Sequence, residues 1–247
     1  MIRGMISYFI KLPLLCLFYI AMMMCIIPEL HGTFVVLGIP WDFAQGGIDM
    51  IVFGRWMLIV GISVLVNGII LEKGRKIEIF IRIRNKKQQD FYRGMIGTCV
   101  ILNVVWGMTL SIGTAFYLGI STALIMFPLL TSNLLFWSML QVFLDFYLHR
   151  NFINGITIIF FNGGSCLFGI YHREISCYLP SFWGMLCRSA FGTDQLQMKN
   201  SYLKMIMLNI IIGMIIFQKE NIIKYIVLVG RLFRKTREEW RNENHPY

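Results

Sequence analysis

The sequence predicts an all-α integral membrane protein with six transmembrane helices, and three observations lead to this fold class. Apolar residues make up 57% of the 247 residues and charged residues only 15%, whereas a soluble domain carries about 25% charged residues. The apolar residues lie in blocks, most of which reach the length of about 20 residues that a helix needs to cross a bilayer. Basic residues are concentrated in alternate connections between the blocks. The predicted spans cover residues 8–28, 51–71, 95–117, 120–144, 152–171 and 202–217.

The first block is interpreted as an uncleaved span rather than a signal peptide. Its apolar stretch ends at Pro28-Glu29 without the small-x-small motif of a cleavage site. The last block is short, and it reaches spanning length only if Lys204 extends its side chain toward the headgroups. Residues 1–217 are therefore expected to form one transmembrane domain.

The distribution of charge predicts the orientation of these spans. Eighteen of the 23 Lys and Arg residues lie on the side that the two termini share with the second and fourth connections. Short basic connections favour the cytoplasmic side of a membrane, so we expect both termini in the cytoplasm. The formal net charge of +10 then faces anionic lipid or a cytoplasmic partner, and a nucleic-acid ligand is not expected.

The outer connections differ in length and character. The first, about residues 29–50, holds Trp41 and a Gly46-Gly47 pair and is expected to dip at the membrane surface. The second, near residues 117–121, is so short that spans three and four should form a tight antiparallel hairpin. The last, residues 172–201, mixes polar and aromatic residues and is expected to contain short interfacial pieces.

Two small residues and one proline bear on the packing of this hairpin. Gly107 and Ser111 lie four residues apart in span three and would let a neighbouring helix approach closely. Pro128 is expected to kink span four. In span two, Arg55 lies near the outer end, where it is expected to reach the interface or pair with Asp49.

Every span from the second to the sixth contains asparagine, and the five candidates are Asn67, Asn103, Asn133, Asn162 and Asn209. A polar group in the bilayer costs free energy unless it finds a partner, so each asparagine is expected to face the bundle interior. Two interpretations remain open, namely hydrogen bonds between helices and a polar stripe that lines a substrate path.

Motifs of the common catalytic and nucleotide-binding sites are absent from the sequence. There is no G-x-x-x-x-G-K-[ST] phosphate loop, no H-E-x-x-H and no G-x-S-x-G. The four histidines are scattered without metal-ligand spacing, and His172 with Cys177 is the one conceivable base–nucleophile pair. Asp145 is expected at the inner interface, and no carboxylate is expected near the midplane, as a proton-coupled carrier would require. We therefore expect no catalytic residue, no metal and no cofactor in this chain.

Two features of the sequence stay open. Cys177 and Cys187 share the last outer connection, and spacing alone does not decide whether they are bridged. Residues 218–247 form a basic tail in which apolar residues follow helical spacing. This pattern is typical of an amphipathic helix on the inner leaflet, and docking on a cytoplasmic partner fits it nearly as well.

The second connection contains the stretch IEIFIRIRNKK, residues 77–87, which alternates isoleucine with charge as a half-buried strand does. Between spans two and three, eight basic residues accompany three acidic ones. The isoleucines need a cover, which is either the inner leaflet or a partner protein. If the stretch is helical instead, Ile77, Phe80, Ile81 and Arg84 would share one face.

The chain resembles small six-span membrane subunits of ATP-binding-cassette exporters, of the type linked to lantibiotic or bacteriocin export and immunity in low-GC Gram-positive bacteria. The resemblance lies in the layout and in two segments. LEKGRKIEIFIRIRNKKQQDFYRG is similar to a basic R-x-x-x-R-type segment ahead of span three, and FQKENII, residues 217–223, is similar to the end of the last span. The tail after Ile223 is longer than such subunits usually show.

The resemblance implies a permease subunit in a bacterial cell membrane that pairs with an identical or different second membrane subunit. A separate ATPase subunit, which binds ATP and Mg²⁺, would dock below and move a peptide or amphiphile out of the membrane or cell. The implied ATPase-coupling segment comprises Arg75, Lys76, Ile77, Ile79, Phe80, Ile81, Arg82, Ile83, Arg84, Lys86 and Lys87. The alternative is a membrane partner that does not transport, such as a sensor, an immunity factor or an assembly factor.

Overall fold

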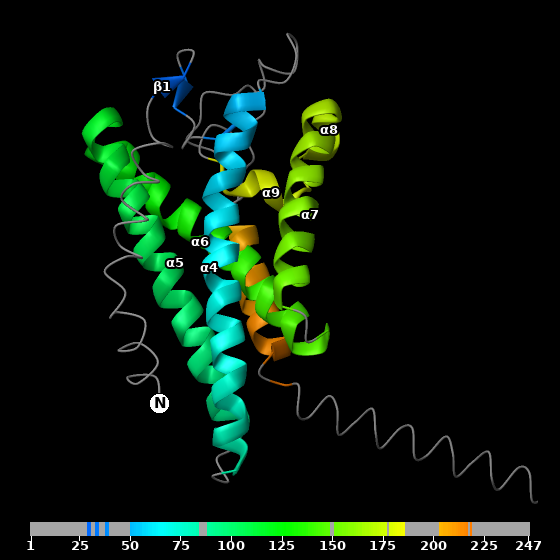
Figure 1. Cartoon of the computed structure of the whole chain (residues 1–247). Coiled ribbons are helices and arrows are strands. Elements are labelled where there is room, and N and C mark those ends of the chain that lie inside the picture. The colour runs from blue at the N-terminus through cyan, green and yellow to red at the C-terminus, as the bar shows by residue number, and fades with distance from the viewer. Residues whose placement is uncertain are drawn as a thin grey trace, which may run out of the picture.

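The computed structural model describes a helical bundle (Figure 1). The described residues are 29–30, 33–34, 38–39, 50–83, 88–148, 151–176, 178–185, 203–216 and 218. The labelled helices are α4 (Met50–Ile83), α5 (Gln88–Leu118), α6 (Ile120–Leu148), α7 (Asn151–Tyr171), α8 (Arg173–Ser176) and α9 (Pro180–Trp183). One further helix, Leu203–Ile216, packs among them. We name the two ends of the bundle the Gly119 end and the Lys73 end.

Four helices are long and apolar enough to cross a membrane: Met50–Gly74, Gly94–Leu118, Ile120–Asp145 and Ile153–Tyr171. They agree with the second to fifth predicted spans, and the protein is therefore a multi-pass helical membrane protein. A helix is the form expected here because it satisfies every backbone polar group within the segment, where lipid offers no hydrogen-bond partner.

The predicted sixth span is a shorter apolar helix, Leu203–Ile216. At 1.5 Å per residue its length is about 21 Å, which is less than the hydrocarbon thickness of about 30 Å. Lys204 Nζ lies 5.5 Å from the centre of the Trp183 ring. The predicted first span, residues 8–28, lies outside the described residues, as does the tail apart from Gln218.

A small strand pair departs from the otherwise helical fold. β1 (Glu29–Leu30) and β2 (Thr33–Phe34) pair antiparallel, with Glu29 opposite Phe34. The sequence predicted an irregular loop in this connection. The remaining described backbone is helical or connects helices.

The predicted hairpin of spans three and four is confirmed by α5 and α6. Gly119 alone separates the two helices, and its φ of 88° is a conformation that glycine adopts without the strain of a side chain. Further along the pair, a Cβ atom added to Gly107 would overlap Thr131 Oγ1 and lie 3.6 Å from Thr131 Cα. The predicted close approach at Gly107 is therefore also present. Pro128 lies inside α6, which continues through it.

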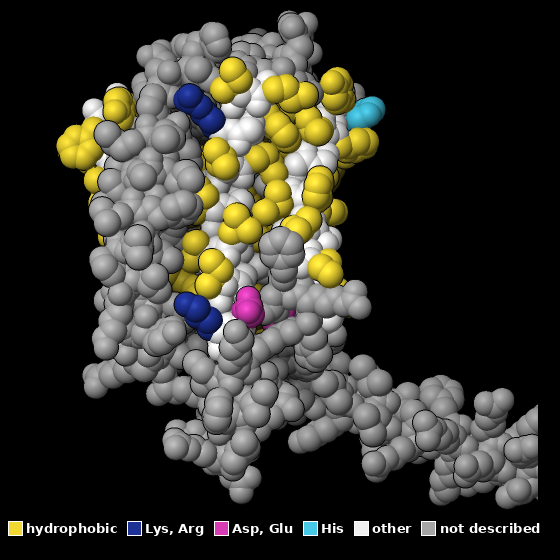
Figure 2. Space-filling view, viewed as in Figure 1, with side chains coloured by type: hydrophobic (Ala, Val, Ile, Leu, Met, Phe, Trp, Pro, Cys, Tyr) yellow, Lys and Arg dark blue, Asp and Glu magenta, His cyan; other side chains and the backbone are white. Residues whose placement is uncertain are grey.

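The apolar periphery of the bundle is what a lipid-facing surface requires. Phe116 is 84% exposed and Phe160 is 76% exposed, and Figure 2 shows hydrophobic side chains spread over the face formed by α4 and α7. In α4, Arg55 and Lys73 are 18 residues apart, or about 27 Å along a helix. This separation is close to the hydrocarbon thickness of about 30 Å. Asp49, the predicted partner of Arg55, lies outside the described residues.

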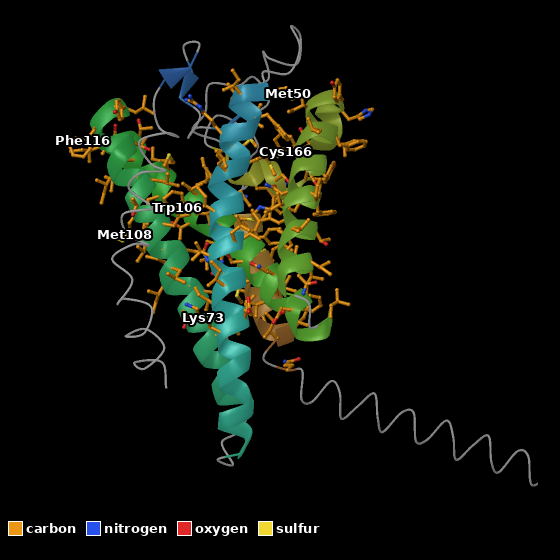
Figure 3. The ribbon with its side chains drawn as sticks, in the orientation of Figure 1. Met50, Lys73, Trp106, Met108, Phe116 and Cys166 are labelled. Carbon is orange, nitrogen blue, oxygen red and sulfur yellow. The ribbon has the colours of Figure 1, made fainter. Side chains whose placement is uncertain are left out.

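Three buried tryptophans occupy the interior: Trp56 on α4, Trp106 on α5 and Trp137 on α6. Trp106 Nε1 donates a hydrogen bond to the carbonyl oxygen of Ile59 at 3.1 Å and so joins α5 to α4 (Figure 3). The indole nitrogens of Trp56 and Trp137 have no acceptor among the residues that the structure describes. All three helices therefore bury a tryptophan ring in the interior. Only the Trp106 ring also gains a hydrogen bond there.

The stretch that alternates isoleucine with charge is helical as far as Ile83, so of the two conformations that the sequence left open the helical one is present in this part. α4 runs for 34 residues from Met50 to Ile83 without a break. Once a helix has formed, each further residue adds one hydrogen bond, and isoleucine disfavours a helix by less than about 0.7 kcal/mol. Extension of the existing helix therefore outweighs the local alternation.

Candidate functional site

Two regions of the described structure stand out for function: a helical extension at the Lys73 end and a polar interior between the helices. The extension consists of the part of α4 after Gly74 and the part of α5 before Gly94. Figure 1 shows the lower end of α4 reaching beyond the ends of α6 and α7. With 34 residues, α4 is about 51 Å long, so it exceeds the hydrocarbon thickness of about 30 Å by a wide margin.

The predicted coupling segment falls on this extension. Residues 75–83 continue α4, while residues 84–87 lie outside the described residues, as do the side chains of residues 75–93. The backbone therefore decides one question that the sequence left open, because the segment as far as Ile83 is helical rather than extended. By helical spacing, Ile77, Phe80 and Ile81 belong to one face, and Ile79 and Ile83 belong to the opposite face.

A hydrogen-bonded network joins α4, α5 and α6 in the interior. The Ser63 hydroxyl donates to Asn103 Oδ1, and the Ser138 hydroxyl donates to the same oxygen at 3.1 Å. Asn67 Nδ2 donates to the Ser138 hydroxyl. Asn103 Nδ2 donates to the carbonyl oxygen of Cys99 on its own helix at 2.7 Å. All four network side chains are buried, so Asn67 and Asn103 take part in bonds between helices.

Next to this network lies a buried amide that the described structure leaves without partners. Gln141 on α6 is fully buried, and neither Nε2 nor Oε1 has a hydrogen-bond partner. Its Nε2 would lie 3.2 Å from a Cβ atom on Gly68 and 3.3 Å from a Cβ atom on Gly155. Two glycines therefore make room for the amide between α4 and α7. Asn154 Nδ2, adjacent in sequence to Gly155, also lacks a partner.

Asp145 lies at the end of the candidate span Ile120–Asp145, which agrees with the predicted position at the end of span four, and it is buried within the protein. Its side chain is only 6% exposed, and it lies on α6 four residues after Gln141. Residues four apart in a helix share a face, so the carboxylate extends the polar interior toward the Lys73 end. It remains close to the end of the candidate span Ile120–Asp145, and the expectation that no carboxylate lies near the midplane still agrees with the described residues.

Asn133 and Asn162 contribute to a second polar region, next to α9. Asn133 Nδ2 donates to the carbonyl oxygen of Pro180 at 3.2 Å. Asn162 Nδ2 donates to the Met57 sulfur at 3.5 Å, and its backbone carbonyl accepts from the Ser181 hydroxyl at 3.4 Å. The side-chain oxygens of both asparagines have no partner.

Asn209 completes the set of five asparagines. Its Nδ2 donates to the carbonyl oxygen of Ser132 on α6 at 2.9 Å, which fixes the Leu203–Ile216 helix against the bundle. The structure thus divides the five asparagines into an α4–α5–α6 network, a pair next to α9 and a separate contact at Asn209. They do not form one continuous hydrogen-bonded stripe among the described residues.

Potential metal ligands can be compared only within the described part of the chain. Among its residues no group of three or more His, Cys, Asp or Glu side chains could hold a metal ion. His172 is exposed, and its ring centre lies 4.6 Å from that of Phe168. Cys177 and Cys187 lie outside the described residues, so neither the His172–Cys177 pair nor the bridge between the cysteines is tested.

Sequence reasoning missed several members of the polar interior. Ser63, Ser138, Gln141 and Asn154 were not among the predicted site residues. A signal was present, because Ser63 and Asn67 are four residues apart and Ser138 and Gln141 are three apart, which places each pair on one helical face. Serine is common in membrane helices, however, and only the packing shows which serines meet an asparagine.

Comparison with models of known protein families, with curated protein sequences and with solved structures found no match.

Proposed function

We propose that the protein is the permease subunit of an ATP-binding-cassette transporter. In this proposal it pairs with a second membrane subunit, identical or different, and a separate ATPase subunit that binds ATP and Mg²⁺ drives it. The cargo is a peptide or amphiphile that leaves the membrane or the cell. The chain itself has no enzymatic role, and the tail of residues 218–247 lies on the cytoplasmic side with the basic extension.

The observation that carries this proposal is the helical extension formed by α4 and the start of α5. Because α4 is continuous from Met50 to Ile83, a partner that moves the extension also moves the membrane part of the same helix. That part carries Ser63 and Asn67, which bond to Asn103 and Ser138 on the neighbouring helices. A force applied outside the bilayer is thereby connected to the polar interior.

The charge of the extension supports a protein partner at the cytoplasmic side. Eight Lys and Arg residues lie between spans two and three, with three acidic residues. Complementary charge orients a docking partner, while apolar side chains provide contact area. The sequence lacks the phosphate loop of an ATPase, so an energy source would have to reside in another chain.

A second candidate function is a membrane partner that does not transport, such as a sensor, an immunity factor or an assembly factor. One observation favours it: the side chains of Ser63, Asn103 and Ser138 bind one another instead of lining an open path. Interactions of this type hold a bundle together as well as they position a moving helix.

Affinity purification of the full chain in mild detergent tests the coupling role. We expect a nucleotide-binding protein to co-purify with the wild-type chain and to be lost from the double variant Phe80→Asp/Ile81→Asp, because two charges enter the same helical face. The matched control is Ile79→Asp/Ile83→Asp, which places two charges on the opposite face of the same extension. Elution of each variant as a single monodisperse species shows that it is folded.

Loss of the nucleotide-binding protein in one pair only would support docking on that face. Retention of this protein by both pairs would contradict the coupling role of the extension. Co-purification of a partner without nucleotide-binding activity, and of no ATPase, would instead support the second candidate function.

A further inference from the structure

α9 is one of the short pieces that the sequence predicted in this outer connection, and it packs into the bundle against α6 and α7. Its Phe182 side chain is fully buried. A Cβ atom added to Gly169 on α7 would lie 2.7 Å from Phe182 Cζ and 2.9 Å from Leu179 Cδ1. Gly169 therefore provides the space that the Phe182 ring and Leu179 occupy. Gly184, directly after α9, makes a similarly close contact with the Asn133 side chain.

The contacts of α9 reach well into the bundle. Asn133, which donates to the Pro180 carbonyl, lies 13 residues after Ile120, or about 20 Å along α6. The candidate span of α6 contains 26 residues, so this contact is near its middle. Backbone that is not part of a spanning helix is tolerated at such a depth only where protein or water covers it. Figure 1 shows α9 beside α7, below the Gly119 end.

Polar atoms on α6 and α7, the helices against which α9 packs, have no hydrogen-bond partner among the described residues. Asn133 Oδ1, Asn162 Oδ1 and Trp137 Nε1 are buried and have no hydrogen-bond partner. Asn133 and Trp137 lie four residues apart on α6 and so share a face. Water that entered after α9 moved away would satisfy these atoms, which would partly offset the loss of Phe182 burial. The seated and withdrawn arrangements are therefore closer in free energy than the burial of Phe182 alone implies.

From this geometry we propose that α9 is a plug that withdraws toward the Gly119 end and admits water to Asn133, Asn162 and Trp137. The plug is held by the Phe182 ring on Gly169, by the Asn133–Pro180 hydrogen bond and by the Ser181–Asn162 hydrogen bond. The inference does not depend on the proposed exporter function, because it concerns only the accessibility of the interior from the Gly119 end.

Cys166 can report this movement, because its thiol reacts with a water-soluble reagent only when water reaches it. This residue is fully buried on α7, and Figure 3 places it near α9. It lies four residues after Asn162 and three before Gly169, both of which contact the plug segment. By helical spacing the three residues share a face. Cys99 on α5 is equally buried but belongs to the α4–α5–α6 network, which makes it a matched control.

The experiment uses the full chain in lipid nanodiscs, where both faces are accessible to a water-soluble maleimide. One variant keeps only Cys166 and the other keeps only Cys99, with the remaining cysteines changed to serine. We expect Cys166 to react about tenfold faster than Cys99, because local opening exposes a segment without global unfolding. Adding Phe182→Ala should raise the rate at Cys166 about tenfold further, since it removes the buried ring that holds the plug.

A second variant covers the case in which Phe182→Ala does not fold. Asn133→Ala removes the hydrogen bond to Pro180 and should raise the Cys166 rate by a few-fold, with the Cys99 rate unchanged. Equal rates at Cys166 and Cys99 in the wild-type background would overturn the proposal. A parallel rise at both cysteines in the variants would also overturn it, because that result reports general loosening of the bundle.

Discussion

Substitution of Gly107 by valine is expected to destabilise the protein by about 1–3 kcal/mol, the usual cost of adding volume to a packed interface. A Cβ atom at this position would overlap Thr131 Oγ1 and lie 3.6 Å from Thr131 Cα. Rotation of the threonine side chain relieves the contact with Oγ1 but not the contact of 3.3 Å with Thr131 Cβ, because the backbone of α6 fixes the position of that Cβ atom. The α5–α6 hairpin would therefore have to separate.

Gly97→Val is the matched control, because it makes the same chemical change in the same helix. A Cβ atom added to Gly97 meets nothing within 4 Å, so this variant should change stability by only a few tenths of a kcal/mol, the difference in helix propensity. The measurement is the free energy of unfolding in mixed detergent micelles. Equal losses at Gly97 and Gly107 would show that the close contact with Thr131 is not responsible.

A double-mutant cycle then assigns the effect to one pair of residues. Gly107→Ala alone should destabilise the protein, whereas Gly107→Ala combined with Thr131→Ala should recover most of the loss, because the overlapping hydroxyl has been removed. Residues in direct contact typically show interaction energies of about 0.5–3 kcal/mol in such cycles. If the changes in unfolding free energy are additive, Gly107 and Thr131 do not interact energetically, which would contradict the prediction.

Gln141→Met is expected to stabilise the protein, which is the opposite of the usual effect of an interior substitution. The Gln141 amide is fully buried and has no partner at either polar atom. A buried polar group without a hydrogen bond costs about 1–3 kcal/mol, and methionine has a similar length and flexibility. The free energy of unfolding of the variant should therefore be higher than that of the wild type by an amount within this range.

Asn103→Leu provides the contrasting control. Asn103 Oδ1 accepts hydrogen bonds from the Ser63 and Ser138 hydroxyls, so leucine would leave both hydroxyl donors without this acceptor. We expect a loss of about 1–3 kcal/mol. If Gln141→Met were to destabilise the protein as Asn103→Leu does, the result would contradict the prediction that the Gln141 amide is an uncompensated polar group.

The membrane-spanning helices could be predicted from the sequence because the bilayer imposes a simple requirement. Each span needs a long apolar run, and the runs over residues 51–71, 95–117, 120–144 and 152–171 correspond to helices that the structure describes. The tight hairpin could also be predicted from the sequence, because a connection of one residue at Gly119 leaves two helices adjacent. The close approach at Gly107 could be predicted because a residue without a side chain permits it.

Prediction was less successful where two local signals competed or where a distant residue decided the outcome. The alternation after Gly74 suggested a strand, but an existing helix extends through it to Ile83. The sequence predicted short pieces in the connection that contains the PSFW segment, but it did not predict that Phe182 would be buried against Gly169. The residues of the segment do not indicate that a glycine on another helix will provide space for Phe182.

The sequence by itself determined that this chain crosses a membrane several times as helices, because hydrophobic length is a property of each segment alone. It also determined the basic character of the connection after α4. Only the tertiary structure decided which polar side chains meet, since hydrogen bonds such as that between Asn67 and Ser138 join residues 71 positions apart. The same holds for Gln141 and for the depth of α9, because burial and hydrogen-bond partners depend on neighbouring helices and not on neighbouring residues.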